Sequence, residues 1–407
     1  MTIPHGYKLT DVGVIPEDWD VKCLGEVGEA LIGLTYKPTE VREHGTLVLR
    51  SSNIQDDALA FDNNVFVEAD IPERIMVRPD DVLICVRNGS RDLIGKSALL
   101  DKRTNGMTFG AFMAVYRSPI GKFVSYLFQS VILKHQINEH LGATINQITN
   151  KSLNSFRVPV PPITEQIAIA TVLSDIDALI TKLDQLIAKN RLIKQGAMQE
   201  LLTGKTRLPG FSGVWEVRKF EDVAEIDPEN LSANTDSQYS FQYIALEDID
   251  RGKLMSYSEK TFSSAPSRAK RRIRIGDILV STVRPNLQSH LLFSELGSDW
   301  VCSTGFSVVR CKSEFAIPAY LYAHLFAAKI NHQIYTLITG SNYPAINSKD
   351  VQALTVDFPP IAEQTAIAKI LSDMDAEITA LEARCNKTRA LKQGMMQELL
   401  TGKTRLA

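Results

Sequence analysis

A perfect ten-residue repeat constrains this chain more than any other feature. The letters QELLTGKTRL stand at 199–208 and return unchanged at 397–406. They end a longer repeat, because 161–208 aligns with 359–406 at a constant offset of 198 without gaps, and 32 of the 48 positions are identical. Self-similarity of this kind indicates one structural unit used more than once. We therefore expect a tandem duplication.

The segments before the repeated blocks also correspond, but much more weakly. WDVKCLGEV from Trp19 matches WEVRKFEDV from Trp215, and PDDVLICVRNG at 79–89 matches IGDILVSTVRP at 275–285. The plan is variable–constant–variable–constant, with segments at 1–157, 158–208, 209–355 and 356–407. We expect the constant segments to perform one task twice, whereas the variable segments share a scaffold and differ in detail.

Each constant segment has the pattern of one helix of roughly 40 residues, or about 60 Å. Pro-Pro and then Glu165 or Glu363 suit a helix N-terminus, and Gly204 or Gly402 stands where a C-terminal glycine belongs. Apolar residues spaced 4, 3, 4, 3 and 4 apart predict a heptad seam. The predicted seam residues are Ile169, Leu173, Ile176, Ile180, Leu183 and Ile187, then Ile367, Leu371, Met374, Ile378, Leu381 and Cys385.

A heptad seam needs a complementary apolar surface. Each helix can pack on its own globular domain, or the two helices can pack on each other. Because the chain carries the seam twice, we favour an antiparallel coiled coil that acts as a rigid spacer. That pairing predicts a nearly circular, pseudo-two-fold chain in which the second copy's end returns beside the first domain. A second apolar cluster follows each seam, at Ile193, Met198, Leu201 and Leu202 and at Leu391, Met396, Leu399 and Leu400.

The motifs of common enzymes are absent or incomplete. Gly-Lys-Thr ends a phosphate-binding P-loop, but here Gln199 and Gln397 replace its first glycine and a predicted helix precedes it. Pro79-Asp80 resembles the start of a nuclease motif, yet no carboxylate stands two places before Lys96. A methyltransferase would show a glycine-rich cofactor loop and an acidic or amide residue before Pro-Pro-aromatic, and VPPI and FPPI lack both. Together these absences favour a non-catalytic protein.

Composition bounds the setting of the protein. The five cysteines are scattered without CxxC spacing, which argues against a zinc site or disulfide framework and for the reducing cytoplasm. No stretch approaches the length of a membrane span. The formal charge of −2 lacks the overall basic footprint of a nucleic-acid binder. Basic residues do gather at 268–276, where a solvated face is the simpler interpretation.

Each variable segment reads as short strands followed by one helix and a polar loop, which is an α+β domain. The expected helices cover 123–141 and 319–338, and the loops are GATINQITNK and GSNYPAINSK. Polar residues follow the strands in VRNGSR at 86–91 and VRPNLQSH at 283–290. Arginine suits guanine edges, Asn and Gln suit adenine edges, and Lys and Ser suit phosphates. Ordinary polar turns are the alternative, but matched placement in both repeats favours DNA contact.

These features resemble the DNA-specificity subunit of type I restriction–modification systems. The resemblance rests on the paired PPITEQ and PPIAEQ helices, each ending in QELLTGKTRL, with LRSSNI at 49–54 and YIALEDI at 243–249. It covers essentially the whole chain. It implies two target-recognition domains that each read half of a split, asymmetric DNA site, and an antiparallel helical spacer. It also implies two adenine methyltransferase (modification) subunits and restriction subunits as partners, which would hold S-adenosylmethionine, ATP and magnesium.

The family has no motif for base-reading residues, so our candidates rest on chemistry and position in the repeat. In the first domain we predict DNA contact by Arg50, Ser52, Asn53, Arg87, Asn88, Ser90, Arg91, Asn146 and Gln147. In the second we predict contact by Arg284, Asn286, Gln288, Ser289, Ser341, Asn342, Tyr343 and Lys349. Two other hypotheses stay open: the specificity subunit of a two-component, type IIB-like restriction system, and a coiled-coil scaffold without a DNA role.

Overall fold

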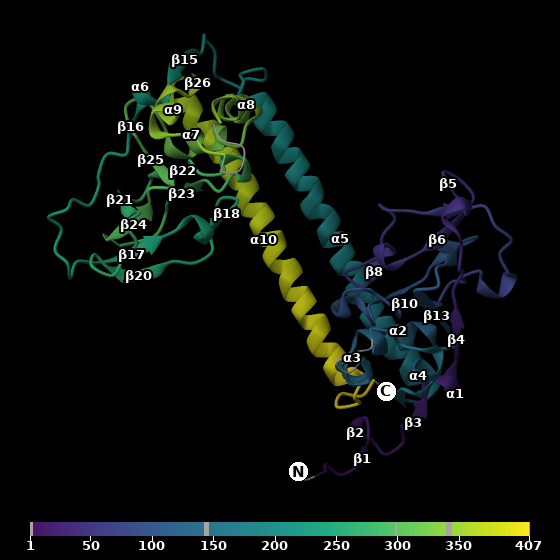
Figure 1. Cartoon of the computed structure of the whole chain (residues 1–407). Helices are drawn as coiled ribbons and strands as arrows, with labels where there is room; N and C mark the ends of the chain where they lie inside the picture. Colours follow the sequence, from purple (N-terminus) through teal and green to yellow (C-terminus); the bar gives the residue numbers. More distant parts are fainter. Residues whose placement is uncertain (1–2, 142–145, 298, 339–343, 407) are drawn as a thin grey trace. The chain divides into compact units, whose positions relative to one another are not determined.

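The computed structural model describes residues 3–141, 146–297, 299–338 and 344–406. It divides into two compact units, each joining one globular domain to parts of both long helices (Figure 1). Unit 1 comprises Met1–Asp184 with Arg384–Ala407, and unit 2 comprises Gln185–Ala383. Each long helix is therefore shared between the two units, whereas the sequence repeat places its boundaries at the ends of the helices.

Unit 1 begins with a hairpin and continues as a domain of short strands with helices on one side. Its strands are β1 Tyr7–Thr10, β2 Gly13–Pro16, β3 Asp20–Cys23, β4 Glu29–Ile32, β5 Val41–Arg42, β6 Thr46–Leu49, β7 Ile54–Gln55, β8 Ala58–Leu59, β9 Phe66–Val67, β10 Val82–Cys85, β11 Ser97–Leu99, β12 Thr108–Phe109, β13 Met113–Arg117 and β14 Arg157–Val160. Its helices are α1 Leu24–Val27, α2 Gly121–Gln129, α3 Val131–Leu141, α4 Asn150–Ser155 and the start of α5 Ile163–Leu201.

Unit 2 repeats this plan. Its strands are β15 Glu216–Lys219, β16 Ala224–Ile226, β17 Ser240–Ile244, β18 Ile249–Asp250, β19 Lys253–Leu254, β20 Ser258–Thr261, β21 Ala269–Ile273, β22 Ile278–Ser281, β23 Leu291–Leu292, β24 Trp300–Ser303, β25 Phe306–Cys311 and β26 Thr355–Phe358. Its helices are α6 Phe220–Val223, α7 Pro318–His324, α8 Ala328–Leu337, α9 Ser348–Ala353 and the start of α10 Ile361–Leu399.

The sheets of the two domains correspond strand by strand. The order β11-β10-β13-β4 in unit 1 matches β23-β22-β25-β16 in unit 2, and all neighbours in both sheets are antiparallel. In the other sheet, the parallel pair β6–β12 matches the parallel pair β17–β24. The outer strands of this sheet differ between the domains. In unit 1 β5 pairs with β9, and in unit 2 β21 pairs with β24. The predicted α+β class with a shared scaffold is therefore confirmed.

A buried ion pair recurs at the same place in both domains. Arg117 makes a bidentate contact to Asp81 with N–O distances of 2.9 and 2.7 Å, and Arg310 contacts Asp277 at 2.8 and 2.7 Å. Asp80 lies just before this pair with a φ of 68°. The Pro-Asp of the incomplete nuclease motif is therefore a turn next to a structural ion pair.

The single helix predicted at 123–141 and at 319–338 is wrong, because the structure has two helices at each place, α2 and α3 in unit 1 and α7 and α8 in unit 2. Ser130 ends α2 with an extended backbone, and both its N–H and its hydroxyl bond to the carbonyl of Leu127. In unit 2 the break falls at 325–327, between α7 and α8. The break lets both parts bury apolar residues, Phe123 and Leu127 in α2 and Leu133 and Ile137 in α3.

Helices α5 and α10 each contain 39 residues and run antiparallel where they meet within each unit. Of the predicted seam residues, Ile176, Ile180, Met374 and Leu381 are half-buried and the others are buried. The pairing is crossed by ion pairs that sequence reasoning missed. These are Asp177–Lys392 and Asp184–Arg389 at 2.7 Å in unit 1, and Asp375–Lys194 at 2.5 Å and Glu382–Arg191 at 2.7 Å in unit 2.

The end of each long helix enters the core of a globular domain. Met396, Leu399 and Leu400 of the α10 end join the core of unit 1. The equivalent Met198, Leu201 and Leu202 of the α5 end join the core of unit 2. Ile193 and Leu391 are 49% and 57% exposed, so they lie outside this apolar cluster. Both alternatives for the helices therefore hold, because the helices pack on each other and the start of each packs on its own domain, through Leu173 in unit 1 and Leu371 in unit 2.

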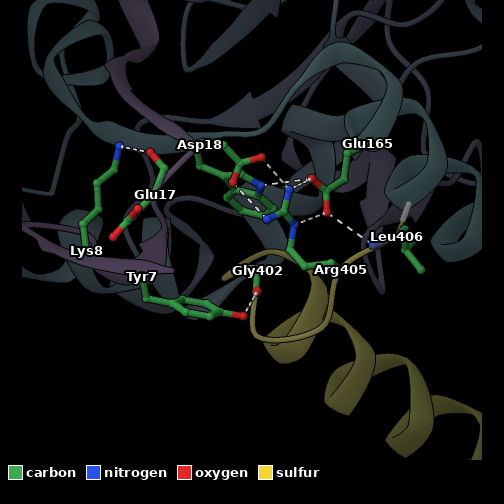
Figure 2. Close-up of polar contacts among 9 residues, drawn as sticks. Tyr7, Lys8, Glu17, Asp18, Glu165, Gly402, Arg405 and Leu406 are labelled. Carbon is green, nitrogen blue, oxygen red and sulfur yellow. Dashed lines mark hydrogen bonds and ion pairs between the residues drawn. The ribbon is translucent and has the colours of Figure 1, made fainter. Parts of the chain in front are cut away.

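A polar contact then fixes the turn that follows each helix. Arg405 donates to both oxygens of Glu165 at 2.8 and 2.9 Å (Figure 2). The Trp19 indole also donates to Glu165, at 3.0 Å. We call Arg405, Glu165 and Trp19 the unit 1 clasp. Arg405 also makes two hydrogen bonds to Asp18. The second copy's end therefore returns beside the first domain, as the antiparallel pairing predicted.

The unit 2 clasp consists of Arg207, Glu363 and Trp215, the repeat equivalents of these residues. Arg207 donates to both oxygens of Glu363 at 2.7 Å, and the Trp215 indole donates at 3.3 Å. The turn glycines Gly204 and Gly402 have φ values of 67° and 70°. A Cβ on Gly402 would lie only 2.4 Å from Pro16, so glycine is required there. The decapeptide thus supplies the same helix end, glycine turn and arginine in both units.

Candidate nucleic-acid interface

The first domain contains a hollow of about 990 Å³ at the ends of several strands, lined by both polar and apolar residues. It lies where the chain leaves β6 and β10 and where it enters β13. Five of the residues predicted for DNA contact line it, namely Arg50, Ser52, Arg87, Asn88 and Asn146. Sequence reasoning missed Tyr36, Asn63 and Phe112, which also line it and come from segments without a distinctive polar pattern.

Arg87 is the exposed arginine of this hollow, and its backbone is held on two sides. Its N–H donates to the carbonyl of Phe112 at 3.1 Å, and Arg87 forms an isolated antiparallel bridge with Gln147. Its guanidinium lies over the ring of Phe112, with 5.1 Å between the guanidinium carbon and the ring centroid. Phe112 is itself 60% exposed. The structure therefore presents a charged, planar group on an exposed aromatic ring.

The neighbouring polar residues are tied more closely to the loop. Arg50 donates to Asn63 Oδ1 at 3.2 Å, and its Nε is buried without a partner among the described residues. Asn88 Oδ1 accepts from the Ser90 backbone at 3.0 Å. These contacts give the rim of the hollow a fixed shape. They also leave the hollow lined by both cationic donors and amide groups.

The four other first-domain candidates are placed outside the lining, and one of them, Gln147, is the bridge partner of Arg87. Asn53 is fully buried, where its Oδ1 accepts from the Arg50 backbone and its amide donates to Ala60 and Asn64. Ser90 and Arg91 are exposed beyond the rim, and Arg91 donates to the carbonyl of Asn138 at 3.1 Å. The geometry gives Asn53 a structural role that supports the loop carrying Arg50.

The second domain presents a different loop at the equivalent strand end. Arg284, Asn286, Gln288 and Ser289 lie in or beside the 3-10 turn Pro285–Leu287. Arg284 and Gln288 have φ values of 49° and 55°, a conformation that non-glycine residues adopt rarely and often at functional sites. Gln288 donates to Asn331 of α8 at 3.1 Å. Lys349 is exposed at the start of α9, and Ser341, Asn342 and Tyr343 lie outside the described residues.

Both domains anchor their polar loop in the same way. Ile148 donates its N–H to the carbonyl of Val86 at 2.8 Å, and Ile346 donates to the carbonyl of Thr282 at 2.9 Å. Both isoleucines are buried, at 1% and 6% exposure. Asn146 and its neighbours are thereby held beside the strand end that carries Arg87. The shared anchor positions side chains that differ between the domains.

The basic run at 268–276 contains β21, and three of its five basic residues pair with acidic side chains. Its ion pairs join Arg271 to Asp227, Arg272 to Asp299 and Arg274 to Glu229. The simpler interpretation of this run as a structural, solvated face therefore fits its contacts.

No group of three or more His, Cys, Asp or Glu side chains capable of holding a metal occurs within the described ranges. His290 and His324 are buried in unit 2, and burial lowers the pKa of His290 to about 4 and that of His324 to about 3. Both are neutral at physiological pH. Among the described helices, α5 and α10 included, none is both long and apolar enough to cross a membrane.

The fold and the site define a class of protein. It has two related domains that carry different polar residues at equivalent strand ends. It also has two paired helices, each of which starts at one domain and ends in the core of the other. Comparison with known proteins identifies the family. The Methylase_S family, described as "Type I restriction modification DNA specificity domain", matches residues 16–192 and 213–390. The chain therefore belongs to the family of type I restriction–modification DNA-specificity subunits.

Similar curated proteins extend over nearly the whole chain. The EcoKI specificity subunit of Escherichia coli (strain K12) is 22% identical over 95% of this chain and 89% of its own length. A putative MjaX specificity subunit of Methanocaldococcus jannaschii is 24% identical over 99% of this chain and 97% of its own.

Solved structures share the fold. The type I restriction–modification S subunit from M. genitalium gives a TM-score of 0.60 at 14% identity, covering 96% of this chain and 97% of its own. A chain from a study of type I assembly and conformational transition gives 0.53 at 17% identity, covering 96% and 99%. At these identities the likeness concerns the fold.

Proposed function

We propose that each globular domain of this chain reads one half of a bipartite, asymmetric DNA sequence. The observation that carries the proposal is the paired arrangement of strand ends, anchored identically but carrying different polar residues. Base edges are distinguished by such donors and acceptors, whereas phosphates are not. A shared scaffold with different side chains suits two different half-sites.

The helices supply the second part of the proposal, which is docking of two adenine methyltransferase subunits. The two ion-pair sets and the two clasps recur with equivalent residues, so the helical surface is offered twice in nearly the same form. Apolar side chains also remain exposed on α5, including Ile163 at 57% and Ile167 at 60%. Such residues suit burial by a partner.

In this proposal the chain is non-catalytic and chemistry belongs to its partners. The modification subunits would hold S-adenosylmethionine, and restriction subunits would hold ATP and magnesium. The partners would also provide much of the phosphate-binding charge, because this chain has a formal charge of −2. The proposed setting is the cytoplasm, where the host DNA lies.

Sequence-selective binding by the assembled complex tests this function. The chain is co-expressed with its modification subunits and incubated with a pool of random duplexes, and retained duplexes are sequenced. We expect enrichment of two short half-sites separated by a fixed number of unspecified base pairs. The scaffold alternative predicts no enrichment, so that result would overturn the proposal. The type IIB-like alternative predicts the same enrichment but cleavage on both sides of the site by its partner.

A further inference from the structure

We infer that Arg87 reads a guanine in the half-site of the first domain, with Phe112 as the residue that positions it. This inference rests on the proposed function and names the chemistry of one of its two sites. The ligand class is a guanine edge in the major groove, which offers two acceptors, O6 and N7.

The first step is the availability of the Arg87 donors. Arg50 donates to Asn63, and Arg91 donates to the carbonyl of Asn138. The Arg87 guanidinium makes no hydrogen bond or ion pair within the described part of the chain, although its backbone is bonded. It therefore keeps its full set of five N–H donors for a ligand.

The second step is the fixed orientation of the group. Phe112 lies 5.1 Å from the guanidinium carbon, and the backbones of both residues are joined by a 3.1 Å hydrogen bond. Arginine stacks on aromatic faces, and its donors lie in the guanidinium plane. Contact with the Phe112 ring therefore restricts the guanidinium without occupying its donors. Less side-chain entropy is lost when such a group binds.

The third step is the surrounding hollow. Arg87 lies in a space of about 990 Å³ lined by polar and apolar residues of the loops next to β6, β10 and β13. A lone arginine on a convex surface would suit a phosphate as well as a base. An arginine within a shaped hollow suits a base edge, because neighbouring groups restrict what can approach. Adenine places its N6 donor where guanine has the O6 acceptor, so it would meet the arginine donors unfavourably.

The experiment uses duplexes in which guanine is replaced by 7-deazaguanine. This analogue keeps Watson–Crick pairing but lacks the N7 acceptor. Both half-sites are first mapped by sequencing methylated DNA. The half-site of the first domain is the one that stays unchanged when 209–355 is replaced by the matching segment of a relative. Each guanine of that half-site is replaced in turn, and binding of the full complex is measured for the wild type, Arg87→Gln and Phe112→Leu. Arg42→Gln is the matched control, since Arg42 is outside the hollow and bonds to Thr39 and Val41.

We expect one guanine at which 7-deaza substitution weakens wild-type and Arg42→Gln binding by roughly tenfold, within the range of a bidentate contact. Arg87→Gln should lose that sensitivity and accept other bases there. Phe112→Leu should reduce the sensitivity several-fold at the same position only, and it tests the inference if Arg87→Gln does not assemble.

Three results would overturn the inference. One is a first half-site without any G·C pair. Another is unchanged 7-deaza sensitivity in both variants. A third is uniform weakening of all duplexes by Arg87→Gln, which indicates a phosphate contact. If the wild-type complex selects no duplex at all, the proposed function itself fails, and the inference falls with it.

Discussion

At the scale of single residues, the clasps explain why ten residues recur unchanged. Arg405 contacts a carboxylate that is 5% exposed, and Arg207 contacts one that is 1% exposed. A buried carboxylate without its arginine is costly, so each copy of the decapeptide must end in the same way. The Gly-Lys-Thr within it is not a phosphate loop, because helix residues precede it and Thr206 bonds back to Glu200.

Removing the arginine of the unit 1 clasp should loosen that unit locally. We predict that Arg405→Ala destabilises the end of α10 by about 1–2 kcal/mol, allowing for the partial exposure of Arg405. Hydrogen exchange of peptides covering 396–406 and 157–165 should then accelerate about 5- to 30-fold. Lys403→Ala, in the same turn, is the control. Equal exchange rates in both variants would contradict a stabilising clasp.

The same clasp predicts acid sensitivity. Burial alone would raise the pKa of Glu165, but hydrogen bonds from Arg405, Trp19 and the Leu406 backbone outweigh it and leave the pKa below its ordinary value. A hydrogen bond from Arg405 likewise lowers the pKa of Asp18.

When folding lowers the pKa of a carboxyl group, its ionised form stabilises the fold at pH values above the unfolded-state pKa. This stability is lost as the pH falls through the folded-state pKa. The stability difference between wild type and Glu165→Gln should therefore be constant above about pH 6 and shrink below about pH 4.5. Denaturant unfolding at a series of pH values measures this. A difference that grows on acidification would show the opposite sign and refute the assignment.

Residue identity in the site was partly predictable. Chemistry and repeat position found Arg50, Arg87 and Asn146, which the structure brings into one hollow. They did not find Phe112 or Asn63, because a single aromatic or amide in a loop carries no periodicity. Nor did they separate Asn53, which is buried, from its exposed neighbours.

At the scale of elements, the heptad pattern predicted both long helices and the face each buries. The crossing ion pairs were not predicted, yet their signal was present. Asp177, Asp184, Arg191 and Lys194 each have an equivalent of the same charge at the offset of 198. The antiparallel pairing predicted that the second copy would end beside the first domain, but the apolar cluster alone did not show that the helix end enters the core of that domain. The break at Ser130 was missed because both halves continue one apolar pattern.

Charge in the buried seam should be far more damaging than charge on the exposed helix face. Leu173 is 0% exposed, whereas Leu192 on the same helix is 69% exposed. We predict that Leu173→Asp costs at least about 3 kcal/mol of stability, while Leu192→Asp changes stability by about 0.5 kcal/mol or less. Adding Ile180→Asp to the first variant should break the spacer further. Thermal unfolding of the isolated chain measures this, and similar losses for the two leucine variants would refute the seam.

At the scale of the whole molecule, each unit combines a globular domain with the start of one helix and the end of the other. A domain is therefore stabilised by sequence from both constant segments, as the core positions of Leu201 and Leu399 show. Because those segments are nearly identical, a variable domain meets the same supporting residues in either place. The variable segments can diverge in their polar loops while the supporting contacts stay the same.

That organisation predicts independent half-sites. Replacing 209–355 by the matching segment of a relative should change one half of the recognised sequence and leave the other half intact. The supporting residues on α5 and α10 stay in place, so the hybrid should assemble. Sequencing of duplexes retained by the hybrid complex measures the outcome. Simultaneous change of both halves would show that the domains do not read DNA separately.

We propose that this chain selects a bipartite DNA sequence for adenine methylation by its partners. Long-read mapping of methylated adenines tests it most directly, in a host carrying the gene with active partner genes, before and after its deletion. We predict a two-part methylated motif that disappears on deletion and returns on complementation. An unchanged pattern of adenine methylation after deletion would contradict the account.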